Sequence, residues 1–158
     1  MADARIFEDL KADHDQHREM LARLADRTTD DREALFEKLR IEITAHAAAE
    51  EESLYATMLA NPDLRDEARH SVSEHKEVDD FFGDLAEMTF GSAEWEETFG
   101  KMRHRYEHHI DEEEEEMFPA AAKELSAETE EKLADIFEKR KPKELVRAEE
   151  EDPGDDRD

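Results

Sequence analysis

The stretch "FGKMRHRYEHHIDEEEEEM", residues 99–117, decides the fold of this chain. Its apolar and aromatic residues recur every three or four positions, as on one face of an α-helix: Phe99, Met102, Tyr106 and Met117. His109 and Glu113 fall on the same line. One histidine and one glutamate of an otherwise solvent-facing acidic run are therefore predicted to point into the protein.

Three more segments carry such a stripe, so the four predicted long helices span about residues 3–27, 31–60, 64–89 and 93–122. Only four glycines and four prolines occur, and several of them fall between these segments. Short connections favour an all-α fold, an up-down-up-down antiparallel four-helix bundle over residues 1–125. We expect a short C-terminal helix over 126–141 and a disordered acidic tail over 142–158.

The composition excludes several classes of protein. The net charge is −26, which disfavours nucleic acid and anionic membrane surfaces as partners. Cysteine is absent, so thiolate metal sites and cysteine nucleophiles are excluded. No stretch has the ~18 apolar residues of a membrane span, and the N-terminus does not resemble a secretory signal. A cytoplasmic protein is the expectation.

In every predicted long helix a histidine interrupts the apolar stripe. With a rise of about 1.5 Å per residue, antiparallel neighbours bring these histidines to one level, within roughly a helical turn. Two of the histidines have a glutamate four residues later on the same face. The predicted inward-facing set is His14, His46, Glu50, His75, His109 and Glu113.

Four imidazoles and two carboxylates are costly to bury without partners. Bound metal resolves that cost, because imidazole nitrogen and carboxylate oxygen suit divalent iron, manganese or zinc. Four histidines and two glutamates fit two metal ions better than one. Taken alone, each histidine could be a hydrogen-bonded core residue, and each glutamate could lie four residues after a histidine by chance. For the whole protein, the alternative is a helical bundle without metal.

Over roughly residues 3–122 the chain resembles the hemerythrin-like family, the HHE cation-binding domain. The resemblance lies in "LKADHDQHREML", "HAAAEEESLY", "SEHKEVDDFF" and "HIDEEEEEMFP", with the histidines and glutamates named above in the family's order and spacing. It implies two iron ions with an oxo or hydroxo bridge, with Glu50 and Glu113 bridging them and the histidines as terminal ligands. Manganese or zinc remain alternatives.

Three further residues bear on this site. The family's oxygen carriers have a second histidine four residues after the first on the third helix, where this chain has Asp79. The departure leaves an open coordination position, an Asp79 ligand or a water, and disfavours simple reversible oxygen carriage. Tyr106 is a candidate ligand or hydrogen-bond partner of a bound oxidant, with a core tyrosine as the alternative. His17 is a candidate for a supporting position or for direct ligation.

The resemblance implies a protein that binds or senses a small oxidant such as dioxygen, nitric oxide or hydrogen peroxide. A peroxide-decomposing, catalase-like enzyme and an iron storage or buffering protein are the alternative functions. We expect the chain to be a monomer or a homodimer. The remaining histidines, His70, His104 and His108, are expected at helix edges or in solvent. Glu51, Glu52 and most of residues 112–116 are expected to be solvated charge on the outer faces.

Overall fold

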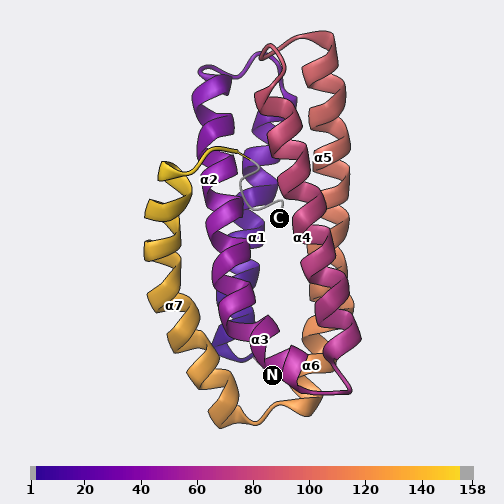
Figure 1. The fold of residues 1–158 in the computed structure, drawn as a ribbon, viewed down its shortest axis with the longest axis vertical. Coiled ribbons are helices and arrows are strands. Elements are labelled where there is room, and N and C mark those ends of the chain that lie inside the picture. Colours follow the sequence, from indigo (N-terminus) through magenta and orange to yellow (C-terminus); the bar gives the residue numbers. More distant parts are fainter. Residues whose placement is uncertain (1–2, 154–158) are drawn as a thin grey trace.

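A computed structural model describes residues 3–153, and every regular element within that range is helical, as predicted. Figure 1 shows the chain, whose elements are α1 (Arg5–Ala25), α2 (Arg32–Glu50), η1 (Glu51–Tyr55), α3 (Ala56–Ala60), α4 (Arg65–Ala86), α5 (Ala93–Glu112), η2 (Glu113–Met117), α6 (Phe118–Glu124) and α7 (Ala127–Glu150). The predicted second helix corresponds to α2, η1 and α3 in succession, and the fourth to α5, η2 and α6.

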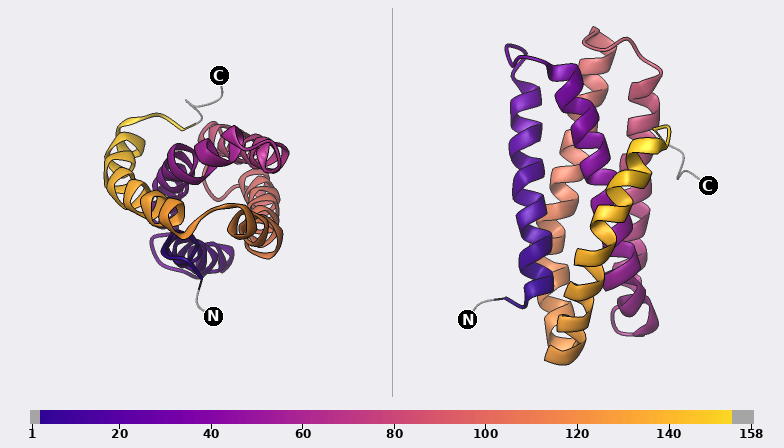
Figure 2. Two further views of the ribbon diagram at one scale, coloured as in Figure 1. Left: turned by 90° about the horizontal axis from the view of Figure 1, so that it is seen from below. Right: turned by 90° about the vertical axis from the view of Figure 1, so that its left-hand side faces the viewer.

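The long helices lie side by side as an elongated helical bundle (Figures 1 and 2). Helix α1 packs against α2 and α5, and α4 packs against the same two helices. Helix α7 lies outside this group and packs against α2 and α1. None of the helices in the described part of the chain has the length and apolar character needed to cross a membrane.

Local sequence sets where several helices begin. The Ser92 side chain accepts a hydrogen bond from the backbone N–H of Trp95 at 3.1 Å, and Ser126 accepts one from Thr129 at 3.1 Å. Such caps satisfy backbone donors that the first turn of a helix leaves unpaired. Gly91, just before Ser92, has φ of 79°, which glycine adopts at little steric cost. These caps fix the starts of α5 and α7.

Two π-helical turns occupy equivalent places in the chain. Turn η1 begins directly after Glu50, and turn η2 begins at Glu113. Turn η1 therefore begins directly after the His46–Glu50 pair, and η2 begins with the glutamate of the His109–Glu113 pair. An isolated π turn inside an α-helix widens the backbone locally and is frequent at functional sites. The periodicity of the sequence did not reveal these turns.

The apolar core is split into two clusters. One contains Phe7, Leu10 and Phe118, and the other contains Leu21 and Phe82. His14 of α1 and His46 of α2 lie between the positions that these helices contribute to the two clusters. The polar side chains thus form a layer with apolar packing above and below, which keeps bulk water away from them.

Helix α7 continues to Glu150. The prediction that the last helix ends at residue 141 is therefore wrong, and so is the prediction of disorder for residues 142–150. Pro142 lies inside the helix, where it removes one backbone hydrogen bond. Contacts with the bundle offset this loss: Lys141 pairs with Asp13 at 2.7 Å and Ala148 is buried. The last predicted tail residues, 154–158, lie outside the described residues.

Candidate metal centre

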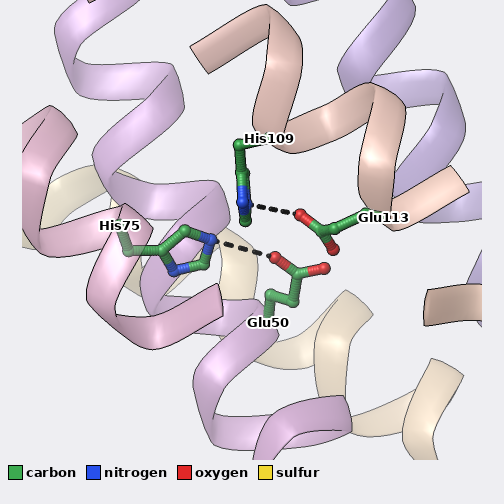
Figure 3. Close-up of side chains that lie close together, drawn as sticks. All are labelled: Glu50, His75, His109 and Glu113. Carbon is green, nitrogen blue, oxygen red and sulfur yellow. Dashed lines mark ion pairs between the residues drawn. The ribbon is translucent and has the colours of Figure 1, made fainter. Parts of the chain in front are cut away.

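Four of the six predicted ligands meet between α2, α4 and α5, as Figure 3 shows. Glu50, His75, His109 and Glu113 each offer a ligand atom, and these atoms all lie within 4.8 Å of one another. The His109 Nε2 atom is 2.6 Å from Glu113 Oε1, and the His75 Nε2 atom is 3.4 Å from Glu50 Oε1. All four side chains are buried or nearly so.

The other two predicted ligands form a second group with Glu50. His14, His46 and Glu50 also offer ligand atoms within 4.8 Å of one another. The rings of His14 and His46 are 5.0 Å apart between centroids. Because Glu50 belongs to both groups, its carboxylate joins the two halves of the cluster. The structure therefore brings all six predicted ligands together.

Unsatisfied polar atoms are concentrated in this layer. Both carboxylate oxygens of Glu50 and of Glu113 are buried and make no hydrogen bond. The Nε2 atoms of His14 and His46 are likewise buried without a hydrogen bond, and that of His109 has only its ion pair with Glu113. Native proteins rarely bury such atoms without a partner, so several pointing at one place require an explanation. Metal ions would satisfy nitrogen and oxygen atoms together, and the residues present fit such a group.

Carboxylates hold the other nitrogen of three histidines. The His14 Nδ1 atom is 2.7 Å from Glu114 Oε2, the His46 Nδ1 atom is 2.8 Å from Asp13 Oδ2, and the His109 Nδ1 atom is 3.0 Å from Glu74 Oε1. Such partners fix the ring orientation and leave Nε2 as the atom available to a metal.

His75 has a looser partner. Its Nδ1 atom lies 3.8 Å from Glu51 Oε2, beyond hydrogen-bond distance.

These supporting carboxylates follow a pattern around the bundle. Each is the immediate sequence neighbour of a predicted ligand, and each contacts the histidine of an adjacent helix: Asp13, Glu51, Glu74 and Glu114. The helical rotation of about 100° per residue turns a ligand's neighbour from the core toward the next helix. The four contacts run from α1 to α2, from η1 to α4, from α4 to α5, and from η2 back to α1, so they close a ring.

The ring was not among the sequence predictions, and Glu114 departs from the expectation that most of residues 112–116 are solvated outer charge. The Glu114 side chain is only 21 % exposed and also pairs with Arg18 at 3.0 Å. The available signal was an acidic residue beside a ligand on each long helix. Its weakness is that 48 acidic residues in the chain make such neighbours common by chance.

His17 and Tyr106 form a buried pair at the edge of the cluster. The Tyr106 hydroxyl is 2.7 Å from His17 Nδ1, and the His17 ring is 5.3 Å from that of His46 between centroids. The His17 Nε2 atom is buried and makes no hydrogen bond. This arrangement is compatible with both predicted roles of His17, support and direct ligation.

A cavity of about 230 Å³ leads toward the cluster between α2 and α4. Its walls are mostly apolar and include Ile43, Ala47 and Val72, and it also reaches His75 and Tyr106. We call it the apolar cavity. Asp79 lines it too, but does not belong to either of the two buried ligand groups.

The remaining histidines lie nearer the surface. His104 is exposed, and 62 % of the His108 side chain is exposed. His70, with 59 % of its side chain exposed, lies near Glu74 and Glu112 and forms a third group of candidate ligands with them. The prediction that these histidines face solvent is consistent with their exposure.

The protonation equilibria differ between the two halves of the cluster. Burial lowers the pKa of His109, but Glu113 and Glu74 outweigh it and raise the pKa to about 10. Burial also lowers the pKa of His75. The carboxylates of Glu50 and Glu51 outweigh this effect and raise the pKa to about 9.

Burial dominates in the other half and lowers the pKa values of His46 and His17. Without metal, imidazolium–glutamate pairs thus stabilise one half, while burial favours the neutral form of His46 and His17 in the other. Metal ions must displace those protons to bind.

Comparisons with known proteins agree with this geometry. The family described as the hemerythrin HHE cation binding domain matches residues 5–121. The crystal structure of a hemerythrin HHE cation binding domain-containing protein from Mycobacterium kansasii is similar, with a TM-score of 0.72 and 25 % sequence identity. The match covers 94 % of this chain and 99 % of that one. No curated protein gives a significant match.

Proposed function

The chain belongs to the hemerythrin HHE cation-binding domain family, and on that premise we propose that it holds two iron ions and binds or senses a small oxidant. The observation that carries the proposal is the convergence of buried imidazole nitrogen and carboxylate oxygen atoms in two groups that share Glu50. Two groups that share the Glu50 carboxylate would suit two metal ions, which His14, His46, His75, His109, Glu50 and Glu113 would hold. Bound iron would supply a reversible change of oxidation state and an open position for a small ligand.

The arrangement of the helices forms part of the proposal. We take α1, α2 with η1 and α3, α4, and α5 with η2 and α6 as an up-down-up-down four-helix bundle. The contacts of α1 and α4 with both α2 and α5 support it. In such a bundle, side chains from facing helices build a metal site in the core. The cluster draws at least one residue from each of these four units.

The chain's own residues prepare the site in three ways. Supporting carboxylates hold three imidazole rings through Nδ1, which presents Nε2 to the cluster. The two apolar clusters cover the layer on two sides, and the low polarity there strengthens electrostatic interactions between its buried side chains. The apolar cavity gives a small, uncharged ligand a path to His75 along mainly apolar side chains.

The test is metal analysis with an optical spectrum on protein expressed with iron supplied. We expect about two iron ions per chain and a visible ligand-to-metal absorption that changes on exposure to dioxygen, nitric oxide or peroxide. Metal content at trace level would refute the proposal. Two zinc or manganese ions would keep the site and refute the oxidant chemistry of iron.

One observation favours peroxide decomposition as a second candidate function. Burial, together with Glu113 and Glu50, raises the pKa of Tyr106, which keeps its hydroxyl protonated where it lines the apolar cavity. A buried proton donor beside the ligand path suits conversion of two hydrogen peroxide molecules to two waters and one dioxygen.

Oxygen release on adding peroxide, reduced in Tyr106→Phe at unchanged metal content, would support this second candidate. Stable adducts with no oxygen release would leave ligand binding as the function.

A further inference from the structure

A second cavity, of about 370 Å³, opens between α4 and the segment formed by α5 and η2. Carboxylates dominate its lining: Asp66, Glu67, Glu74, Glu112, Glu113 and Glu116. We call it the acidic cavity. Its charge opposes the approach of anions and attracts cations, because a cleft lined by one sign of charge concentrates counter-ions.

The third group of candidate ligands lies in this cavity. His70, Glu74 and Glu112 offer ligand atoms within 4.8 Å of one another. The His70 Nε2 atom is 3.5 Å from Glu74 Oε1 and 3.7 Å from Glu112 Oε1. Imidazole nitrogen with two carboxylate oxygens is a donor set for a divalent first-row cation.

The acidic cavity also reaches the buried cluster. Glu74 Oε1, which faces His70, is 3.0 Å from the Nδ1 atom of His109. The other nitrogen of His109 is 2.6 Å from Glu113. Glu113 lines the cavity and is buried; its Oε1 atom is the one paired with His109, whereas its Oε2 atom makes no hydrogen bond. A buried carboxylate oxygen without a hydrogen bond beside the cavity is a separate indication, beyond the acidic lining, that a cation is accommodated there.

Exposure falls along this line of candidate ligands. The exposed fractions of the side chains are 59 % for His70, 33 % for Glu112, 3 % for Glu74 and 1 % for Glu113. A cation passing inward would thus exchange water for protein ligands in steps.

Arg105 limits how tightly the outer group can hold a cation. Its guanidinium Nη1 atom is 3.6 Å from Glu74 Oε2, and its Nε atom is 3.0 Å from Glu77. A positive charge beside Glu74 opposes a bound cation. The side chains of His70 and Glu112 are partly exposed, so they keep most of their mobility when no cation is bound. A weak outer site suits transfer, since a tight site would retain the ion.

We propose that the acidic cavity is the route by which divalent cations reach the buried cluster, with His70, Glu74 and Glu112 as a weak transfer site at its mouth. The role as a route rests on the proposed function, because it requires a buried site to fill. The apolar cavity offers a cation no comparable set of carboxylates.

The test compares uptake of Co²⁺ by the metal-free full chain, followed by the visible absorption of cobalt with nitrogen and oxygen ligands. His70→Ala/Glu112→Gln removes two outer ligands and leaves Glu74 on His109. His104→Ala/Glu115→Gln is the matched control, since both residues are exposed and the change in charge is the same. Circular dichroism establishes that both variants fold.

We expect uptake to slow by about ten-fold in His70→Ala/Glu112→Gln with the same final cobalt content of the buried cluster, and to stay within about two-fold in the control. Equal uptake rates in wild type and His70→Ala/Glu112→Gln would overturn the route and leave the buried site standing. Equal slowing in both variants would also overturn it, because general surface charge would then explain the rate. Wild type that takes up no cobalt would instead overturn the buried site.

Discussion

The two cavities differ in chemistry although both reach the same cluster. The apolar cavity lies between α2 and α4 and is walled mainly by apolar side chains around His75 and Tyr106. The acidic cavity lies between α4 and α5 and is walled mainly by carboxylates around His109 and Glu113. Helix α4 separates them and contributes to both. A small neutral molecule crosses the first without losing strong hydration, whereas a cation is attracted by the second.

This difference indicates that the metal ion and the small ligand can reach a buried site through different openings. A wall that attracts a divalent cation retains water and disfavours an apolar gas. A mainly apolar wall, which suits the gas, offers a cation fewer carboxylates. Separate paths let the chain meet both requirements, and the following experiments test whether the two cavities act separately.

The largest expected effect comes from removing the residue shared by the buried cluster and the acidic cavity. Glu113→Ala deletes a candidate bridging ligand, so the metal content should fall from about two ions per chain to about one or none. Metal analysis of purified protein measures this. Glu115→Gln, an exposed change in the same acidic run, should keep the full metal content; equal loss in both variants would contradict the assignment of the inward face.

Filling the apolar cavity should separate ligand access from metal binding. Ala47→Phe places a ring in the space between α2 and α4. We expect the rate of nitric oxide or dioxygen binding to the iron-loaded protein to fall by about ten-fold, because the ring narrows the path to the cluster, with unchanged metal content. Stopped-flow absorption measures the rate. Ala22→Phe on the exposed surface of α1 is the control, and an unchanged rate in Ala47→Phe would show that ligands enter elsewhere.

Salt should affect the two paths unequally. Raising sodium chloride from about 20 mM to about 500 mM shortens the screening length to roughly 4 Å. Cobalt uptake through the acidic cavity should slow several-fold, while the binding rate of an uncharged ligand should change by less than about two-fold. The same stopped-flow measurements serve for both. Similar salt dependence of both rates would argue against separate paths.

The smallest effect is expected at Asp79. This residue lines the apolar cavity and does not belong to either buried ligand group. Asp79→Asn should therefore leave the metal content of the iron-supplied protein unchanged, as metal analysis would show. Loss of one ion would instead identify Asp79 as a ligand, and the apolar cavity would then share in metal binding.

The six ligands could be predicted because periodicity fixes them within each helix. His46 and Glu50 lie four residues apart, as do His109 and Glu113, and that spacing keeps each pair on one face. Equal helix lengths between short connections then bring the pairs to one level. The helical class and the cluster follow from these two rules.

The supporting carboxylates and α7 could not be predicted in the same way. Glu114 looks like any other residue of an acidic run until α1 places His14 beside it at 2.7 Å. Pro142 looks like a helix end until contacts of α7 with the bundle hold the backbone on both sides of it. Both outcomes depend on neighbours remote in sequence.

The sequence by itself determined which side chains face inward, because a helix repeats every 3.6 residues whatever surrounds it. Only the tertiary structure decided which carboxylate meets which imidazole, how the two cavities divide around α4, and how far α7 extends. Those features depend on distances between helices, and no periodicity within one helix encodes a distance to another.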